Sequence, residues 1–191
     1  MKVIHLHNNN IQLIKKAAKH NREAQHVLYE THAPKMLSIC RYYIKDLQHA
    51  ENVMLNGFLK AFTNLKDFKD AGSFEGWLRK IMVREAISFL RQQKTIEFSV
   101  EDVEIVHQQD NTIESDIEVD EIQRHIDALP EGYKMVFVMY AIEGYKHQEI
   151  ATVLNITEGT SKSQLFKAKQ MLQHKINTIN KRHNETSEMG R

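Results

Sequence analysis

The sequence contains few of the residues that break or cross-link a chain. Its 191 residues include 7 Gly, 2 Pro and 1 Cys. A many-stranded sandwich or barrel needs a turn about every 10 residues, so this scarcity argues against both. The single Cys40 has neither a second thiol for an internal disulfide nor a CxxC partner for zinc. We expect it to be a buried small hydrophobe in a reducing compartment, and we expect helices throughout.

Long apolar runs are also lacking. No segment approaches the ~18 uncharged apolar residues of a membrane span. The first residues, Met1 to His7, lack the apolar core of a signal peptide. The sequence therefore predicts a cytoplasmic protein without membrane insertion.

Charge divides the chain into three parts. Residues 1–96 carry a net charge of +8, residues 97–127 of −10 and residues 128–191 of +3. Two basic blocks around an acidic segment favour a polyanionic partner, although a solvated acidic linker between ordinary surfaces is the simpler alternative.

The predicted fold is all-α, with two small helical domains joined by an acidic linker. Residues 95–117 show neither a helical nor a strand period, which indicates a boundary. We place the first domain at 10–94, the linker at 95–118, the second domain at 119–180 and a fraying polar tail at 181–191.

The segment from Ser73 to Lys94 predicts an amphipathic helix. Its apolar residues share one arc, the expected core face: Phe74, Leu78, Ile81, Met82, Ala86 and Phe89. The opposite arc is almost wholly cationic: Lys80, Arg84, Ile87, Arg91 and Lys94. Such a stripe suits a phosphate backbone, with a plain solvated exterior as the alternative. Trp77, at the edge of the apolar arc, suits either the core or stacking on single-stranded DNA.

A second apolar stripe precedes this helix. It recurs at helical spacing from Ala50 onward and is expected to be core: Val53, Met54, Leu55, Phe58, Leu59, Phe62 and Leu65. Gly57 lies inside it and costs about 1 kcal/mol relative to Ala in a helix. This glycine predicts a close packing contact or an irregularity.

Residues 129–176 predict a helix-turn-helix. Pro130 is expected at the first position of a helix that Gly144 terminates, and a short helix follows from about Lys146 to Leu154. In the next turn, Asn155 suits a left-handed position and Thr157 suits an N-cap.

The following helix, from Glu158 to about Ile176, is the candidate recognition helix. It is expected to bury one set of residues: Ser161, Leu165, Ala168, Leu172 and Ile176. Its other face offers groups suited to base edges in the major groove: Thr160, Ser163, Phe166, Lys167 and Gln170. An ordinary three-helix bundle with a polar exterior is the alternative.

Several motifs occur together in a specific order. They are Leu13-Ile14-Lys15-Lys16-Ala17, Arg22-Glu23-Ala24 with Leu28-Tyr29, Ala50-Glu51 with Phe58-Leu59 and Phe62, Gly72 to Leu78 with Leu90-Arg91, Leu129-Pro130 with Glu143-Gly144, and Glu149-Ile150-Ala151 leading to Glu158 to Ser163. Over about Leu13 to Lys175 the chain resembles bacterial sigma factors of the extracytoplasmic-function (ECF) group, which contain only sigma regions 2 and 4.

The resemblance implies a non-enzymatic subunit of RNA polymerase that initiates transcription at promoters. Contacts with core polymerase, at the clamp coiled coil of its largest catalytic subunit, would come from Glu51, Asn52, Leu55, Asn56 and Phe58. Recognition and melting of the −10 element would come from Trp77, Arg79, Lys80, Arg84, Ser88 and Arg91. A flipped base would enter a pocket near the loop before Trp77.

The resemblance also assigns the −35 element to the helix from Glu158. The residues implied at base edges are Lys162, Ser163, Phe166 and Lys167, and those implied nearer phosphates are Thr160, Gln164 and Lys169. It implies an anti-sigma factor as a partner, no catalytic residue, no cofactor and no metal. The acidic segment would follow the RNA-exit path of the polymerase and mimic RNA.

Several positions depart from the family pattern. Arg84 stands where Asn is usual and Ser88 where Asp or Asn is usual, which leaves the promoter preference open. In the polymerase-docking helix, positions that are commonly acidic or amide hold His49, Asn52, Leu55 and Asn56, and Glu51 is the retained acid. The docking surface is therefore expected to be more apolar than usual. Ser161 replaces the usual Val, which would loosen the packing of the recognition helix by about 1 kcal/mol.

Other classes of protein were weighed against this interpretation. A stand-alone helix-turn-helix regulator does not need the Gly72 to Leu78 motif or the basic helix after it. A metalloenzyme fits poorly, because the eleven His form no HExxH motif and His147 is expected on the outer side of a short helix. A decoy for an anti-sigma factor would not need two cationic faces.

Overall fold

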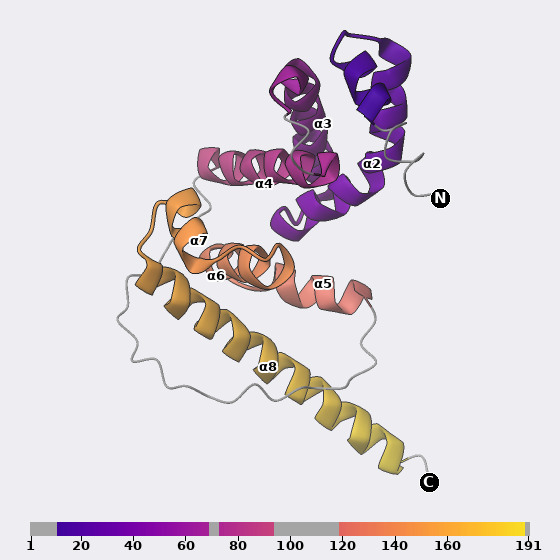
Figure 1. The fold of residues 1–191 in the computed structure, drawn as a ribbon. Helices are drawn as coiled ribbons and strands as arrows, with labels where there is room; N and C mark the ends of the chain where they lie inside the picture. Colours follow the sequence, from indigo (N-terminus) through magenta and orange to yellow (C-terminus); the bar gives the residue numbers. More distant parts are fainter. Residues whose placement is uncertain (1–10, 69–72, 94–118, 190–191) are drawn as a thin grey trace, which may run out of the picture. The chain divides into compact units, whose positions relative to one another are not determined.

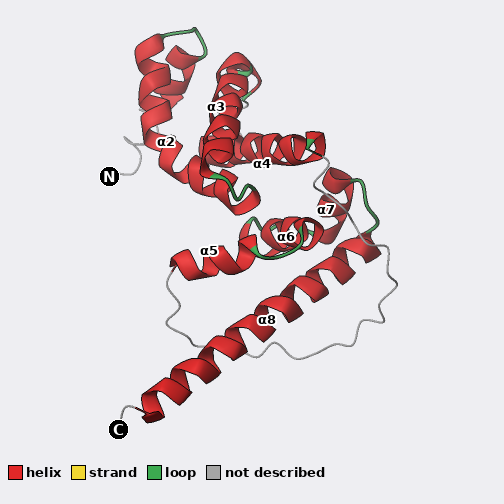
Figure 2. Ribbon diagram, turned by 180° about the vertical axis from the view of Figure 1, so that it is seen from behind, coloured by secondary structure: helices red, strands yellow, loops and turns green. Residues whose placement is uncertain are grey.

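The computed structural model describes residues 11–68, 73–93 and 119–189, with the side chains of 11–68, 73–93 and 121–177. These residues form helices and turns and contain no strand (Figures 1 and 2). The all-α prediction is therefore confirmed. The chain divides into two compact units, Met1–Gln93 and Lys94–Arg191. The predicted linker, residues 95–118, and the basic end of the predicted stripe at Lys94 lie outside the described residues.

The first unit is built from three long helices. A short helix over residues 11–17 leads into α2 (Arg22–Tyr43), α3 (Leu47–Thr63), the 3-10 turn η1 (Leu65–Asp67) and α4 (Phe74–Gln92). Asn21 and Asp46 begin α2 and α3 by accepting hydrogen bonds of 2.8 Å each from the backbone N–H three residues on. Each cap satisfies a donor that the first helical turn leaves unpaired.

The three helices pack against one another around an apolar core. Contacts join α2 to α3, α2 to α4 and α3 to α4. Cys40 of α2 is fully buried in this core, and burial raises the pKa of its thiol to about 12. The predicted role of Cys40 as a buried small hydrophobe is confirmed.

The buried surface of α4 differs from the predicted one. Val83, Ile87 and Leu90 are buried, whereas Ile81 and Phe89 are only partly buried. Placing Ile87 in the cationic stripe was therefore wrong. The reason is that α4 packs against both α2 and α3, so its buried arc is wider than the single stripe that periodicity indicates.

Gly57 of α3 packs closely against Met82 of α4. A Cβ at this position would overlap Sδ of Met82 and lie 2.9 Å from its Cε. Met82 is itself fully buried. The close packing contact that the sequence predicted at Gly57 is confirmed, and it explains a glycine in the middle of a 17-residue helix.

Replacing Gly57 by Val is expected to destabilise the protein by about 2 kcal/mol or more, because the added methyl groups overpack the contact with Met82. Urea unfolding followed by circular dichroism measures this. Gly76→Ala is the control, since the nearest atom to its Cβ would be Ser73 Cβ at 3.9 Å, and it should be neutral or stabilising. Adding Met82→Ala to Gly57→Val should cost less than the sum of the two changes; strict additivity would contradict the packing account.

The second unit contains the helix-turn-helix. It consists of α5 (Val119–Asp127), α6 (Glu131–Phe137), the π-helical turn η2 (Val138–Ile142), α7 (His147–Leu154) and α8 (Glu158–Met189). Helix α8 packs on α5, α6 and α7. Figure 1 shows α8 running as one long helix past these shorter ones.

The turns of this unit follow the local rules closely. Gly144 has φ +74° and Asn155 has φ +57°, so both adopt the left-handed conformation that the sequence predicted. Thr157 accepts a 3.0 Å hydrogen bond from the backbone N–H of Thr160, which confirms its N-cap role.

Three details of the second unit differ from the prediction. Pro130 is the residue before α6 and not its first residue. Helix α6 is followed directly by the π-turn η2, in which the backbone N–H of Glu143 donates to the carbonyl oxygen of Val138 at 3.0 Å. Helix α8 continues to Met189, whereas the sequence predicted an end near Ile176 because the apolar period stops there.

Candidate nucleic-acid interface

One face of α4 is cationic and exposed. Lys80, Arg84 and Arg91 follow one another at intervals of four and seven residues, which returns each side chain to the same face. All three are exposed, and Ser88 is exposed beside them. The exposed helix surface predicted from sequence therefore exists, without Ile87.

Trp77 lies on this face, and its ring contacts two phenylalanine rings. Its ring centroid is 5.6 Å from that of Phe68 and 5.8 Å from that of Phe74. The indole is only partly buried, so part of the ring remains accessible. A ring fixed in this way beside cations has the properties of a base-stacking platform.

Arg79 lies apart from the other candidate residues of α4. It is partly buried, and its position is about half a helical turn from the face of Arg84. The pKa of Glu75 is lowered mainly by its 2.5 Å ion pair with Lys35, which joins α4 to α2. The charges of His32 and Arg79 lower it further. The structure therefore places Arg79 towards α2, not with the exposed stripe.

The first turns of α8 present a mixed polar surface. Lys162 and Lys169 are exposed, while Thr160, Phe166 and Lys167 are partly buried. Lys162 forms a 2.8 Å ion pair with Glu158, which lowers the pKa of that carboxyl group. Thr160 Oγ1 lies 2.8 Å from Thr157 Oγ1. The ion pair thus sets Lys162 beside the start of the helix.

Two predicted −35 residues are buried. Gln164 is 1% exposed, and Ser163 is 8% exposed with its hydroxyl donating to Thr160 O at 3.0 Å. Gln164 lies three residues after Ser161 and four before Ala168, both fully buried, so it shares their face. The sequence-based assignment of Gln164 to the phosphate-contacting surface is therefore not supported by its position.

His147 was missed by the sequence analysis, which placed it on an outer side. Its ring stacks on Tyr140 with centroids 4.6 Å apart and planes 22° apart. Its Nδ1 lies 2.9 Å from the hydroxyl of the fully buried Ser161. The available signal was Ser161 itself, because a hydroxyl at a core position requires a polar partner.

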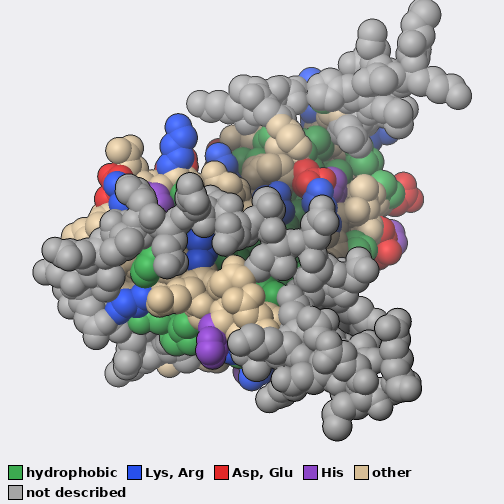
Figure 3. All heavy atoms as spheres, turned by 90° about the horizontal axis from the view of Figure 1, so that it is seen from below, with side chains coloured by type: hydrophobic (Ala, Val, Ile, Leu, Met, Phe, Trp, Pro, Cys, Tyr) green, Lys and Arg blue, Asp and Glu red, His purple; other side chains and the backbone are tan. Residues whose placement is uncertain are grey.

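The outer face of α3 is apolar. Leu47, Leu55 and Leu59 are 55%, 49% and 66% exposed, although Leu55 and Leu59 were expected in the core. Asn52 and Asn56 are exposed and Glu51 is partly buried. We call Leu47, Leu55 and Leu59 with these three polar residues the α3 outer face. Figure 3 shows that hydrophobic and basic side chains both reach the surface of the described residues.

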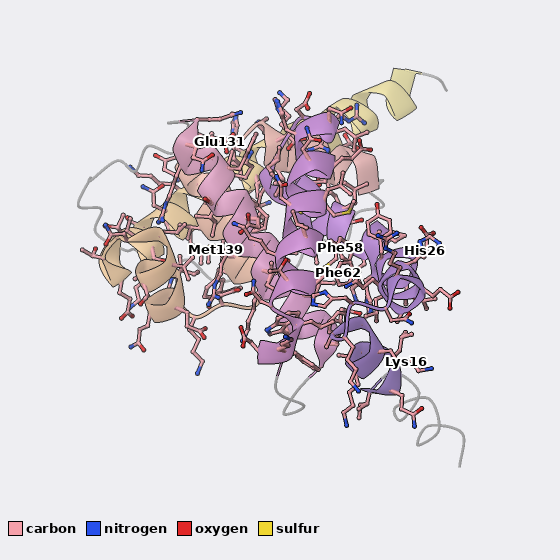
Figure 4. The ribbon with its side chains drawn as sticks, turned by 90° about the horizontal axis from the view of Figure 1, so that it is seen from above. Lys16, His26, Phe58, Phe62, Glu131 and Met139 are labelled. Carbon is pink, nitrogen blue, oxygen red and sulfur yellow. The ribbon has the colours of Figure 1, made fainter. Side chains whose placement is uncertain are left out.

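Phe58 does not belong to this face. It is 3% exposed, and its ring centroid lies 4.9 Å from that of Tyr29 and 5.8 Å from that of Phe62. Figure 4 shows Phe58 and Phe62 along the same helix. Phe58 contributes to the core that supports α3, so its predicted contact with core polymerase is not supported by its position.

No cluster of metal ligands occurs among the described residues: no group of three or more His, Cys, Asp or Glu side chains is close enough to hold an ion. In the same part of the chain, none of the helices combines the length and apolarity needed to span a bilayer.

Comparisons with known proteins match both units. The family described as "Sigma-70 region 2" matches residues 28–96, and "Sigma-70, region 4" matches residues 120–172. The RNA polymerase sigma-H factor of Pseudomonas aeruginosa is 26% identical, over 84% of this chain and 90% of its own. The ECF RNA polymerase sigma-E factor of Haemophilus influenzae is 24% identical, over 87% and 95%.

The fold has a solved counterpart. The sigma factor RpoE from Bartonella quintana, solved in complex with the anti-sigma factor NepR, superposes with a TM-score of 0.53 at 18% identity, over 78% of this chain and 94% of the other. The order of the two matched regions, the ECF relatives and the shared fold agree. The chain belongs to the sigma-70 family and is an alternative RNA polymerase sigma factor of the ECF group, with regions 2 and 4.

Proposed function

We propose that three surfaces divide the work of this sigma factor. The α3 outer face binds core RNA polymerase, the exposed face of α4 binds and melts the −10 element, and the first turns of α8 read the −35 element. The observation that carries the proposal is the chemistry of these surfaces: one is apolar, one is cationic beside a partly buried tryptophan, and one is polar at a helix start.

The α3 outer face suits a helical protein partner. Leu55 and Leu59 lie one turn apart and are about half or more exposed, an arrangement that a helix packing into a groove would cover. Glu51 and Asn52 supply a polar margin. These properties fit the clamp coiled coil of the largest catalytic subunit as the occupant.

The face of α4 suits a melted strand. Lys80, Arg84 and Arg91 attract phosphates, and Trp77 offers a ring for an unstacked base. Ser88 is the hydroxyl on the same face, available to a base edge or a phosphate. Unstacking a base costs a few kcal/mol, which stacking and phosphate contacts can offset. Arg79 lies outside this face, and its charge acts on Glu75 instead.

The start of α8 suits the major groove. Lys162 lies on the exposed side of the first turn, and the consecutive residues Phe166 and Lys167 follow about one turn later, so the three can reach adjacent base pairs. Thr160 and Lys169 would contact the backbone phosphates. Ser163 and Gln164 support the helix from its buried side.

We also propose that an anti-sigma factor holds this protein, in the cytoplasm where the polymerase works. The support is the Bartonella relative, which was solved with one. The exposed leucines of α3 form an apolar surface that such a partner would cover.

Replacing Lys162 or Lys167 by Ala is expected to weaken discrimination of the −35 sequence by about 1–3 kcal/mol, or roughly 5- to 150-fold, at the base pair each residue contacts. Holoenzyme binding to a set of single-base −35 variants measures this. Lys175→Ala, about two turns further along α8 than Lys167, is the matched control. Unchanged discrimination in both variants would rule out the base contacts.

A further inference from the structure

A partly buried hydrogen bond joins the two helices of the helix-turn-helix through their first turns. His147 is the first residue of α7, and its Nδ1 lies 2.9 Å from Oγ of Ser161 in the first turn of α8. Ser161 is fully buried, so its hydroxyl depends on a protein partner. The imidazole is that partner.

The imidazole is also held from its other side. Its ring stacks on Tyr140 of the π-turn η2, with centroids 4.6 Å apart. His147 therefore connects three elements that meet at the start of the recognition helix: η2, α7 and α8. A second link runs parallel to it, because Gln148 hydrogen-bonds the carboxylate of Glu158.

The charges around His147 favour its neutral form. Burial and the nearby Lys162 lower the pKa of the imidazole, and Glu158 opposes them more weakly. Tyr140 is the titratable group that faces it from η2. A neutral imidazole has one donor and one acceptor nitrogen, so Nδ1 can either accept from the Ser161 hydroxyl or donate to it.

The position of Ser161 determines where the reading residues point. Thr160 and Lys162 are its immediate neighbours on α8, Lys162 exposed and Thr160 partly buried. Any rotation or shift of this turn moves them relative to the major groove. A buried contact that fixes Ser161 therefore also fixes the direction of Lys162.

We propose that His147 is a positioning residue for −35 recognition, which fixes the first turn of α8 through its hydrogen bond to Ser161. The inference rests on the proposed −35 role of α8. For Ser161, where the sequence predicted looser packing, the proposal adds that the hydroxyl exchanges an apolar contact for a directional one.

Four variants separate the hydrogen bond from the ring packing. His147→Phe keeps a flat ring on Tyr140 and removes the bond. His147→Asn keeps a polar atom near the position of Nδ1 and removes the stacking. Ser161→Ala removes the other partner, and the double variant His147→Phe/Ser161→Ala closes the cycle.

Each variant is assembled with core polymerase and tested on two promoters with the same −10 element. One promoter carries the −35 sequence that the wild-type holoenzyme selects from a library of DNA fragments, and the other carries that sequence scrambled. The ratio of the two affinities should fall about three- to tenfold in His147→Phe and in Ser161→Ala. The double variant should fall no further than the single ones, and His147→Asn should stay within about twofold of the wild type.

Other outcomes overturn the inference. If the ratio is unchanged in both His147→Phe and Ser161→Ala, the bond does not position α8. If His147→Asn is impaired while His147→Phe and Ser161→Ala are both normal, only the ring packing matters. Should His147→Phe fail to fold, Ser161→Ala and His147→Asn still decide between these results. A wild-type holoenzyme that does not distinguish the two promoters would instead overturn the proposed −35 role of α8.

Discussion

A chain carrying Leu55→Glu and Leu59→Glu is expected to bind core RNA polymerase at least about a hundredfold more weakly than the wild type. Burying an exposed leucine in an interface contributes about 1.5–3 kcal/mol, and a carboxylate in its place must lose its hydration. Two such losses exceed about 3 kcal/mol, where each 1.4 kcal/mol is tenfold. Both side chains are already exposed, so folding should be unaffected.

Fluorescence anisotropy of labelled protein titrated with core polymerase measures this effect. Ile122→Glu is the matched control, because Ile122 is 46% exposed but lies on α5 in the other unit. It should bind like the wild type. If the double variant also binds normally while its circular dichroism is native, the α3 outer face is not the polymerase-binding surface.

The second large effect is expected from the cationic face of α4. Replacing Lys80, Arg84 and Arg91 together by Ala should strongly reduce open-complex formation and flatten its dependence on salt. Each phosphate contact contributes about 0.7 to the slope of log affinity against log salt on a single strand and about 0.9 on duplex DNA. Losing three contacts should therefore lower the slope by about 2 to 3.

Permanganate reactivity of thymines in the −10 region, recorded over a series of salt concentrations, measures both quantities. Lys45→Ala with Lys66→Ala is the control, since these lysines are exposed outside the α4 face. Holoenzyme assembly should be normal in every variant. An unaltered salt slope would show that the face is only solvated helix surface.

Local rules predicted the turns well. Gly144, Asn155 and Thr157 occupy the positions that their conformational preferences favour, because each preference depends only on the neighbouring backbone. The all-α fold and the helix-turn-helix followed from the same kind of information. The order of motifs then carried the resemblance that the family comparisons confirm.

Tertiary contacts explain what periodicity missed. Ile87 and Gln164 lie on helices that pack against more than one neighbour, so their buried faces are wider than one stripe. Phe58 is core because Tyr29, far away in sequence, packs on it. Leu55 and Leu59 match the apolar pattern of a core but are exposed. A helix that contacts a partner protein shows the same apolar pattern, so the pattern alone does not separate the two cases.

The pairing of His147 with Ser161 could not be predicted from either residue alone. His147 lies 14 residues from Ser161, and the two meet only because α7 and α8 cross at their first turns. The π-turn η2 places Tyr140 against the imidazole, and this contact could not be predicted from the two residues alone either. A serine at a core position was the one sequence signal that a polar partner was needed.

The most direct test of the account is reconstitution of the purified protein with bacterial core RNA polymerase, followed by transcription from a library of DNA fragments and sequencing of the start sites. The account predicts co-elution with the polymerase and transcripts that share one −35 and one −10 sequence. Failure to bind the polymerase, with duplex DNA still bound, would contradict it and would indicate a stand-alone helix-turn-helix regulator.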